Sequence, residues 1–240
     1  MKNLFLFLFL LVVFTSKAQD NRVSGLNSRQ FTKYWKVESE SPDYKVTFQG
    51  DTAEIVSPKG LTLWRKEKMS GKVTIEYDAC VVVESDGDRL SDLNCFWMAS
   101  DPQYPDNLWK REKWRSGIFL NCYSLQLYYL GYGGNHNSTT RFRRYDGDES
   151  GITNPKARPA ILKEYTDAGH LLKPNHWYHI KITNENNRVS YYIDGERLVD
   201  FRDAEPLREG WFGFRTTLSR TRITNFSYCL LYTSDVADEL

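Results

Sequence analysis

The run from Leu90 to Met98 carries polar side chains within an otherwise apolar strand pattern. With a side-chain period of two, Asp92 and Asn94 fall on the same face as Phe96, and the apolar residues between them fall on the other. A carboxylate and an amide on one face offer acceptors and donors to the hydroxyl groups of a ligand. We therefore expect this face to line a binding groove; the alternative is an ordinary solvent-facing strand surface.

A second polar face follows the glycine-rich stretch 131–134. Arg141, Arg143 and Tyr145 alternate along a short strand and so point to one side. Two guanidinium groups on one face form a fork that suits a carboxylate, for example that of a uronic acid. The alternative is a charged outer strand whose arginines pair with nearby acids such as Asp146.

Abstraction of a proton beside a carboxylate needs a base that titrates near neutrality, a cation or amide that neutralises charge, and an acid. Residues of these types occur near both strands, and we expect catalytic roles for His136, Tyr123, Tyr128 and Arg141. We expect ligand-binding roles for Asp92, Asn94, Asn135, Arg143, Tyr145, His170 and Arg215. For each histidine the alternative is a surface or satisfied core position.

The composition limits the partners that these residues can serve. The 240 residues carry a formal net charge of +1, with 32 Lys and Arg against 31 Asp and Glu. This balance gives no bulk attraction to nucleic acid or to an anionic membrane surface. The 7 Trp, 15 Tyr and 13 Phe place much of the apolar character in side chains that strands and sugar-binding surfaces favour. The length fits one globular domain.

Short runs with a period of two dominate the chain and predict antiparallel strands. We expect strands at residues 44–48, 53–56, 60–64, 73–83, 177–183, 189–193, 197–201, 211–215 and 222–228. We expect turns at Gly50–Asp51, Pro58–Gly60, Glu185–Asn187 and Asp194–Glu196. The Asp-Gly pair of the last turn is the one that tight primed hairpin turns prefer. No long helix is predicted.

The stretch 177–228 resembles the C-terminal half of concanavalin A-like jelly rolls, the sandwich of laminin G domains and glucanases. The resemblance is carried by Trp177-Tyr-His-Ile-Lys-Ile, Val189-Ser-Tyr-Tyr-Ile-Asp-Gly-Glu, Gly210-Trp-Phe-Gly-Phe-Arg and Ile223-Thr-Asn-Phe. Residues 44–130 fit the first half of that fold more loosely. The resemblance implies an all-β, concanavalin A-like jelly-roll sandwich of two antiparallel sheets, which lectins and enzymes share.

The middle of the chain points to a narrower group. Asp88-Arg-Leu-Ser-Asp-Leu-Asn-Cys-Phe-Trp-Met-Ala99, Ser116-Gly-Ile-Phe119 and the stretch 131–147 are similar to an uncharacterised family of exported concanavalin A-like proteins. That family occurs in polysaccharide-degrading bacteria beside pectin and rhamnogalacturonan enzymes. The resemblance implies a glycan context without fixing a reaction.

Hydrolysis by paired carboxylates is the rival chemistry. Jelly-roll glucanases of the retaining type carry Glu-x-Asp-x-x-Glu or a shorter relative on one strand. Glu76-Tyr-Asp78 begins that pattern but continues as Ala79-Cys-Val, and Glu84–Asp88 reads as a glycine-containing turn. We therefore expect Glu76 and Asp78 to form a polar outer face.

No cofactor or metal ligand set is predicted. Cys80, Cys95 and Cys122 form no Cys-x-x-Cys pair, which argues against zinc and leaves free thiols or one disulfide open. The Asp-Gly-Asp stretches 86–88 and 146–148 offer oxygens for a structural calcium, although such sequences are more often plain turns.

The tryptophans divide into two groups. Trp35, Trp64, Trp97 and Trp177 lie in alternating runs, where we expect them to pack in the interior. Trp109 and Trp114 lie in a polar, basic stretch between strands, where they form either an exposed sugar-stacking surface or a partly buried lid.

Both ends differ from the body of the chain. Lys2, an apolar run and Ser16-Lys-Ala18 predict a secretory signal at residues 1–18, since the run is too short to span a bilayer. Residues 229–240 resemble a translated sequencing adapter, CLLYTSDAADE, and differ from it in that stretch only at Val236. We expect them to be an artefact, the alternative being a genuine last strand with a polar tail. Residues 19–40 form a lead-in and 41–228 the jelly roll.

These features predict an exported monomer, periplasmic or extracellular, that acts on an acidic, uronate-containing plant or algal polysaccharide or oligosaccharide. Cleavage by elimination, as in a polysaccharide lyase, is the favoured activity because the arginine, tyrosine and histidine set is present and the glucanase motif is incomplete. The alternatives are a glycoside hydrolase, a non-catalytic carbohydrate-binding or lectin-like domain, and an adhesion module. No nucleic-acid partner and no membrane span are expected.

Overall fold

The computed structural model describes residues 22–231, and the expected signal segment 1–18 and most of the expected adapter tail lie outside these residues. The strands are β1 (Arg22–Ser24), β2 (Trp35–Ser39), β3 (Lys45–Gln49), β4 (Thr52–Arg65), β5 (Met69–Ser70), β6 (Lys72–Val81), β7 (Leu93–Ser100), β8 (Gln126–Gly133), β9 (Thr139–Asp146), β10 (Lys163–Tyr165), β11 (Tyr178–Glu185), β12 (Arg188–Ile193), β13 (Glu196–Arg202) and β14 (Glu209–Leu231). Short helical turns lie between them: α1 (Phe31–Tyr34), η1 (Leu108–Arg111), α2 (Glu112–Arg115), η2 (Leu120–Ser124), α3 (Gly134–Asn137), α4 (Ser150–Thr153), η3 (Pro155–Ala157) and η4 (Ala168–His170).

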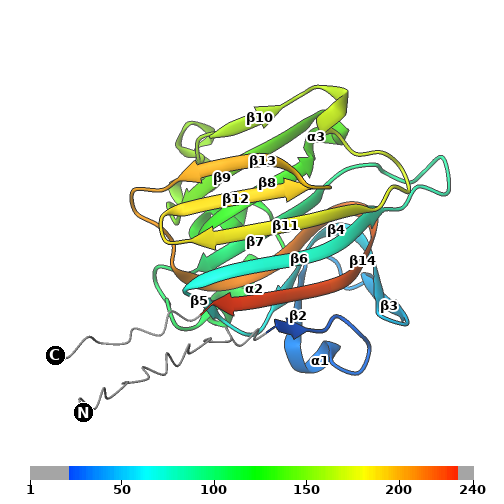
Figure 1. The fold of residues 1–240 in the computed structure, drawn as a ribbon, viewed down its shortest axis with the longest axis horizontal. Coiled ribbons are helices and arrows are strands. Elements are labelled where there is room, and N and C mark those ends of the chain that lie inside the picture. Colours follow the sequence, from blue (N-terminus) through cyan, green and yellow to red (C-terminus); the bar gives the residue numbers. More distant parts are fainter. Residues whose placement is uncertain (1–21, 232–240) are drawn as a thin grey trace, which may run out of the picture.

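The strands form two facing layers of antiparallel sheet. Hydrogen-bonded neighbours follow the order β10-β9-β8-β7-β14-β6-β11-β12-β13. The path is continuous because residues 211–215 of β14 pair with β7, whereas residues 221–231 pair with β6. We call β7 to β10 with the first part of β14 the groove layer, and β6, β11, β12 and β13 with the rest of β14 the outer layer (Figure 1). The prediction of an all-β sandwich of antiparallel sheets is confirmed.

β4 and β14 cross together from one layer to the other. Residues 53–57 of β4 pair with the second part of β14, residues 60–64 pair with the first part, and the register shifts between Thr217 and Ser219. The predicted turn at Pro58–Gly60 is therefore wrong, and the two strands predicted at 211–215 and 222–228 are one. Proline lacks a backbone N–H, so a strand tolerates it where the ladder is already interrupted.

The sequence periodicity of the outer layer is confirmed. From Lys72 to Ala79 the residues of β6 alternate between half-buried and buried, so one face turns inward and the other outward. Asp194 and Gly195 both have positive φ, as the predicted tight turn between β12 and β13 requires. Among residues 22–231 no helix exceeds five residues, which also agrees with the sequence.

Aromatic side chains fill the space between the layers. The rings of Trp97 in β7 and Tyr191 in β12 have centroids 6.2 Å apart, and those of Phe142 in β9 and Phe201 in β13 are 5.5 Å apart. Large aromatic rings bury the most area per residue, and ring pairs at such centroid distances add stabilisation beyond that burial. The opposite face of each layer consequently points away from this core.

A covering segment, residues 107–125 with η1, α2 and η2, packs on the outward face of the groove layer. Its Leu108, Cys122, Tyr123 and Leu125 join Trp64, Phe96, Leu127, Tyr129, Tyr145 and Trp211 of the sheet in a second apolar cluster. Arg115 of α2 anchors the segment, since its guanidinium donates to both carboxylate oxygens of Glu38 in β2 at 2.6 and 3.3 Å. The segment covers only part of the face, and the uncovered part forms a groove.

Candidate functional site

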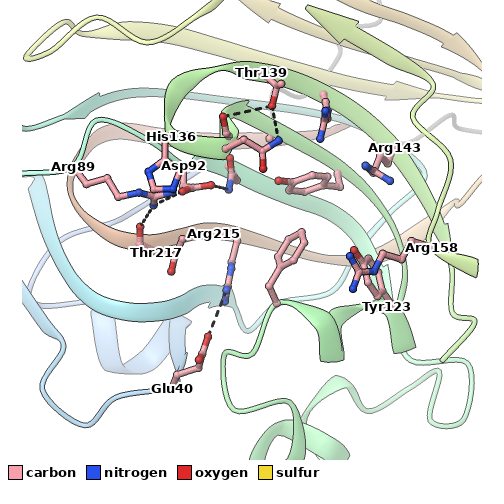
Figure 2. A pocket seen from close by; sticks show the side chains of 17 residues that line it. Glu40, Arg89, Asp92, Tyr123, His136, Thr139, Arg143, Arg158, Arg215 and Thr217 are labelled. Carbon is pink, nitrogen blue, oxygen red and sulfur yellow. Dashed lines mark hydrogen bonds and ion pairs between the residues drawn. The ribbon is translucent and has the colours of Figure 1, made fainter. Parts of the chain in front are cut away.

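A groove of about 430 Å³ opens on the uncovered part of the groove layer. Its lining residues are Glu40, Arg89, Asp92, Asn94, Phe119, Tyr123, Tyr129, Gly131, Gly134, Asn135, His136, Thr139, Arg141, Arg143, Arg158, Arg215 and Thr217 (Figure 2). Among the described residues the lining includes five guanidinium groups and two carboxylates. The groove therefore favours a ligand that carries negative charge.

Strand alternation explains why the polar side chains meet here. Asp92 immediately precedes β7, and Asn94 is its second residue; both face the groove. Leu93, Cys95 and Trp97 face the core between the layers. Arg141 and Arg143 in β9 also face the groove, and Phe142 turns inward. The side-chain faces predicted for both runs are confirmed.

Asp92 is held at one end of the groove by three donors. Its carboxylate accepts hydrogen bonds from Arg89 at 2.5 Å, Ser91 at 2.8 Å and the Asn94 amide at 3.2 Å. The amide oxygen of Asn94 is buried and has no hydrogen-bond partner among residues 22–231. A buried acceptor without a partner is costly, so this oxygen is suited to receive a hydroxyl hydrogen from a ligand.

Arg215 forms part of the floor. It is only 3% exposed, its guanidinium donates to the Gly117 carbonyl, and it lies 5.6 Å from the centre of the Phe119 ring. Its second guanidinium nitrogen lies 3.9 Å from Glu40, which lines the same side of the groove. Arg215 is thus fixed in place by the covering segment rather than free to follow a ligand.

Arg143, Arg158 and Tyr123 gather at the other end (Figure 2). Arg143 donates to the carbonyl of Pro159, and Arg158 donates to the carbonyl of Gly151 at 3.3 Å. Within the described residues neither guanidinium pairs with a carboxylate. Burial raises the pKa of Tyr123, and the charges of Arg158 and Arg143 oppose that shift, so both cations lie close to the phenol. This end presents two positive charges without an acidic partner.

The other groove arginine on β9 is already paired. The guanidinium of Arg141 donates to Glu164 of β10 at 2.5 Å. Glu164 thus neutralises Arg141 in part, as the alternative of a charged strand with paired arginines predicted, although the partner is not one of the acids that follow the strand.

His136 and Asn135 reach the rim on a tight turn, α3. Both residues have positive φ and exposed side chains, and the Asn135 amide donates to Thr139 at 3.2 Å. The side chain of Asn137 holds the turn against Leu172. Its amide nitrogen donates to the Leu172 carbonyl, and its amide oxygen accepts from the Leu172 N–H. The imidazole of His136 has no hydrogen-bond partner among residues 22–231.

Three of the eleven proposed site residues lie outside the groove. Tyr128 points into the core side, where its hydroxyl donates to Asp203 at 2.6 Å and burial raises its pKa. Tyr145 is fully buried beneath Tyr123, with ring centroids 5.1 Å apart. His170 lies in a separate hollow of about 140 Å³. The remaining eight line the groove.

The structure adds lining residues that the sequence patterns missed. Arg158 follows η3 in the loop between β9 and β10, and Glu40 lies in the turn after β2, so neither belongs to a groove strand. No local periodicity marks them. Arg89 had a weak signal, since it lies three residues before Asp92 in a polar stretch.

His170, at the end of η4, connects its own loop to β13 through side-chain contacts. Its ring contacts Asp167 at 2.8 Å and Glu196 at 3.2 Å and stacks on Tyr165 with centroids 4.0 Å apart. Burial lowers the pKa of His170, but the hydrogen bonds and charges of Asp167 and Glu196 outweigh it, so the pKa is raised. A group with a raised folded pKa stabilises the fold below its unfolded pKa and loses that contribution as the pH rises through the folded value.

We therefore expect a pH-dependent effect of His170→Gln. At pH 5.5 the variant should unfold at lower urea than the parent protein, by about 0.5 kcal/mol in unfolding free energy, as for exposed ion pairs. At pH 8.5 the difference should be smaller, because this contribution declines as the pH rises above the unfolded pKa and through the folded one. Urea titrations at both pH values measure this, and an equal deficit at both would assign the effect to packing on Tyr165 instead.

Neither a metal cluster nor an activated thiol is found in the described part of the chain. No group of three or more His, Cys, Asp or Glu side chains there is arranged to hold a metal ion. Asp88 and Asp146 of the Asp-Gly-Asp stretches instead accept backbone N–H bonds within their own turns. Cys95 and Cys122 are buried free thiols, and burial raises their pKa values to about 12 and about 11.

The carboxylates of the incomplete glucanase motif lie outside the groove. Glu76 and Asp78 are on the outward face of β6, where Asp78 contacts His179 at 2.8 Å and accepts a hydrogen bond from Asn225 at 2.6 Å. This is the polar outer face that the sequence predicted.

The layered architecture is that of a jelly-roll sandwich, as solved structures confirm. A protein of unknown function with a galectin-like fold from Bacillus subtilis matches with a TM-score of 0.64 at 16% identity, over 82% of this chain and 89% of that one. The carbohydrate-binding module CBM66 from Bacillus subtilis matches with a TM-score of 0.52 at 14% identity, over 81% and 94%. The β-glucanase of Bacillus licheniformis matches with a TM-score of 0.52 at 8% identity, over 83% and 93%.

The chain belongs to the family described as Domain of unknown function (DUF6250), whose model matches residues 55–226. The matched residues run from β4 into β14 and so include the strands that carry the groove. No curated protein matches the sequence. None of the helices between residues 22 and 231 is long and apolar enough to cross a membrane.

Proposed function

We propose that this protein is an exported carbohydrate-active protein whose groove binds an acidic, uronate-containing polysaccharide. The observation that carries the proposal is the guanidinium pair Arg143 and Arg158, which faces the groove without an acidic partner in the described residues. Guanidinium groups bind carboxylates through charge-assisted hydrogen bonds. The fold supports the proposal, because a carbohydrate-binding module and a glucanase share it.

The two ends of the groove suit different groups of an acidic polysaccharide. A uronate carboxylate fits between Arg143 and Arg158, where positive charge is in excess. Hydroxyl groups of a neighbouring sugar fit Asp92 and Asn94, whose oxygens accept hydrogen bonds. Tyr129 and Phe119 supply aromatic surface between them.

Eliminative cleavage is the reaction we favour. A base removes the proton on C5 beside the uronate carboxylate, the electron pair forms the C4–C5 double bond, and the bond from C4 to the departing oxygen breaks. Arg143 and Arg158 would stabilise the charge that develops on the carboxylate. His136 is the base candidate, and Tyr123, whose raised pKa keeps it protonated, would deliver a proton to the departing oxygen.

Binding without cleavage is the second candidate, and His136 favours it. The imidazole is exposed and has no hydrogen-bond partner within residues 22–231. A catalytic base is normally oriented by a second group. Hydrolysis has less support, because the two carboxylates of the lining, Asp92 and Glu40, already lie against Arg89 and Arg215.

The test is to incubate the purified protein with rhamnogalacturonan, polygalacturonate, ulvan and glucuronan and to follow both reducing ends and the ultraviolet absorbance of an unsaturated uronate. A rise in both signals, lost in His136→Ala, supports elimination. Reducing ends without the absorbance would replace elimination by hydrolysis. If neither reducing ends nor absorbance rises but an immobilised acidic glycan retains the protein, the protein binds the glycan without cleaving it. Failure to bind any of these glycans would overturn the proposal as a whole.

A further inference from the structure

Trp177 is on the surface, contrary to the expectation that it packs in the interior. It is 43% exposed, whereas Trp35, Trp64 and Trp97 are fully buried. It immediately precedes β11 at the edge where the strand enters the outer layer. The prediction went wrong because it assigned Trp177 to the interior by residue type, whereas the alternation of β11 buries Tyr178 and Ile180 and so places Trp177 on the outward face with His179. An exposed indole leaves a large apolar surface in water, a surface that a bound ligand could cover.

Trp177 forms one wall of a hollow on the outward face of the outer layer. The hollow holds about 480 Å³ and is lined by Thr47, Phe48, Gln49, Thr52, Glu54, Trp177, Arg220 and Arg222. It is as large as the groove of the groove layer, but it is on the opposite side of the sandwich, because Arg220 and Arg222 belong to the second part of β14.

The strand register places three of the lining residues, Thr47, Glu54 and Arg222, in one row across the sheet, and Arg220 lies two residues before Arg222 on β14. Thr47 pairs with Glu54, Glu54 pairs with Arg222, and Arg222 pairs with Cys80. Tyr178 pairs with Ala79, so Trp177 lies at the level of Cys80. Neighbouring strands are about 4.8 Å apart, so the distance from Trp177 to Glu54 spans about 14 Å. The hollow therefore fits an extended oligomer better than a single small molecule.

The charged side chains of the hollow are neutralised by one another and by Glu84, which lies outside its lining. Arg220 contacts Glu54 at 2.9 Å and Glu84 at 2.6 Å, and Arg222 contacts the same two carboxylates at 2.7 and 3.4 Å. Two cations and two anions in a closed network leave no net charge to select an acid, yet they hold polar atoms in fixed positions. Thr47, Gln49 and Thr52 add neutral donors and acceptors.

We propose that this hollow is a second glycan-binding site, selective for a neutral polysaccharide. The Trp177 ring stacks on the apolar face of a sugar ring, and the Glu54, Arg220 and Arg222 network together with Gln49 bonds its hydroxyl groups. The combination of one aromatic surface with a few fixed polar groups is typical of small-ligand sites. The site is independent of the acidic ligand proposed for the groove, since no lining residue is shared.

Affinity electrophoresis in gels that contain galactan, arabinan, xyloglucan or mixed-linkage β-glucan tests the proposal. We expect at least one of these neutral glycans to retard the protein and Trp177→Ala to weaken that binding at least tenfold. Trp114→Ala is the matched control, because Trp114 is 42% exposed but lies outside the hollow, and it should bind as the parent does. Arg143→Ala should also keep neutral-glycan binding, which separates this site from the groove.

Two results would overturn the second site. One is that none of the four neutral glycans retards the parent protein. The other is equal retardation of the parent and Trp177→Ala, with circular dichroism showing both folded. Should Trp177→Ala instead fail to fold, Gln49→Ala and Thr52→Ala, both at exposed or half-exposed positions of the hairpin, provide the same comparison. Loss of polygalacturonate binding in Arg143→Ala with neutral binding intact bears on the groove alone.

Discussion

Arg143→Ala is expected to weaken binding of polygalacturonate about 30-fold, which corresponds to about 2 kcal/mol. The guanidinium faces the groove, its only hydrogen bond among the described residues is to the Pro159 carbonyl, and Arg158 alone would remain beside Tyr123. Stability should change little, because the side chain is half-buried and supports no buried anion. Isothermal titration at fixed ionic strength measures the affinity, and thermal unfolding measures the stability.

Two comparisons make the Arg143 result specific. Arg197→Ala removes one positive charge from an exposed position on β13 and should leave the affinity unchanged, which controls for net charge. Arg141→Ala should lower the affinity less than Arg143→Ala does, since the Arg141 guanidinium already forms an ion pair with Glu164. Unchanged affinity in Arg143→Ala, or an equal loss in Arg197→Ala, would show that the groove does not recognise a carboxylate through this pair.

Glu38→Ala is expected to lower the free energy of unfolding by about 3 kcal/mol, the lower end of the effect of breaking a buried ion pair. Arg115 is fully buried and Glu38 nearly so, and the two share hydrogen bonds at 2.6 and 3.3 Å. Burial raises the pKa of Glu38 and the charge of Arg115 opposes that shift. Removal of the carboxylate leaves a buried cation with Asp101 at 3.7 Å as its remaining anion. Urea unfolding measures the loss.

The paired variant Glu38→Leu with Arg115→Leu separates charge from packing. It removes both charges and leaves Asp101 bound to Arg111 at 2.7 and 2.9 Å, so we expect it to be more stable than Glu38→Ala. Because Arg115 anchors the covering segment beside the groove, Glu38→Ala should also weaken glycan binding. Equal stability of Glu38→Ala and the parent protein would mean that Arg115 is satisfied by Asp101 and the Leu108 carbonyl alone.

The sequence by itself determined the strand faces. A period of two is a local property, since successive side chains of a strand point to opposite sides whatever the strand packs against. For that reason the shared faces of Asp92 with Asn94 and of Arg141 with Arg143 were predictable, as was the inward face of β6. The tight turn at Asp194 was predictable from its Asp-Gly pair. The period of two also identified a chain made of strands, and the resemblance of residues 177–228 to concanavalin A-like jelly rolls indicated the sandwich.

The tertiary structure decided which faces are covered and which stay open. Periodicity cannot tell that the covering segment buries Tyr145 beneath Tyr123 while it leaves Arg143 exposed to the groove. Nor can it tell that β4 and β14 continue through both layers, because Pro58 to Gly60 reads locally as a turn. Arg158 and Trp177 owe their sites to the packing of distant segments, and the energy of that packing depends on contacts that no short stretch of sequence contains.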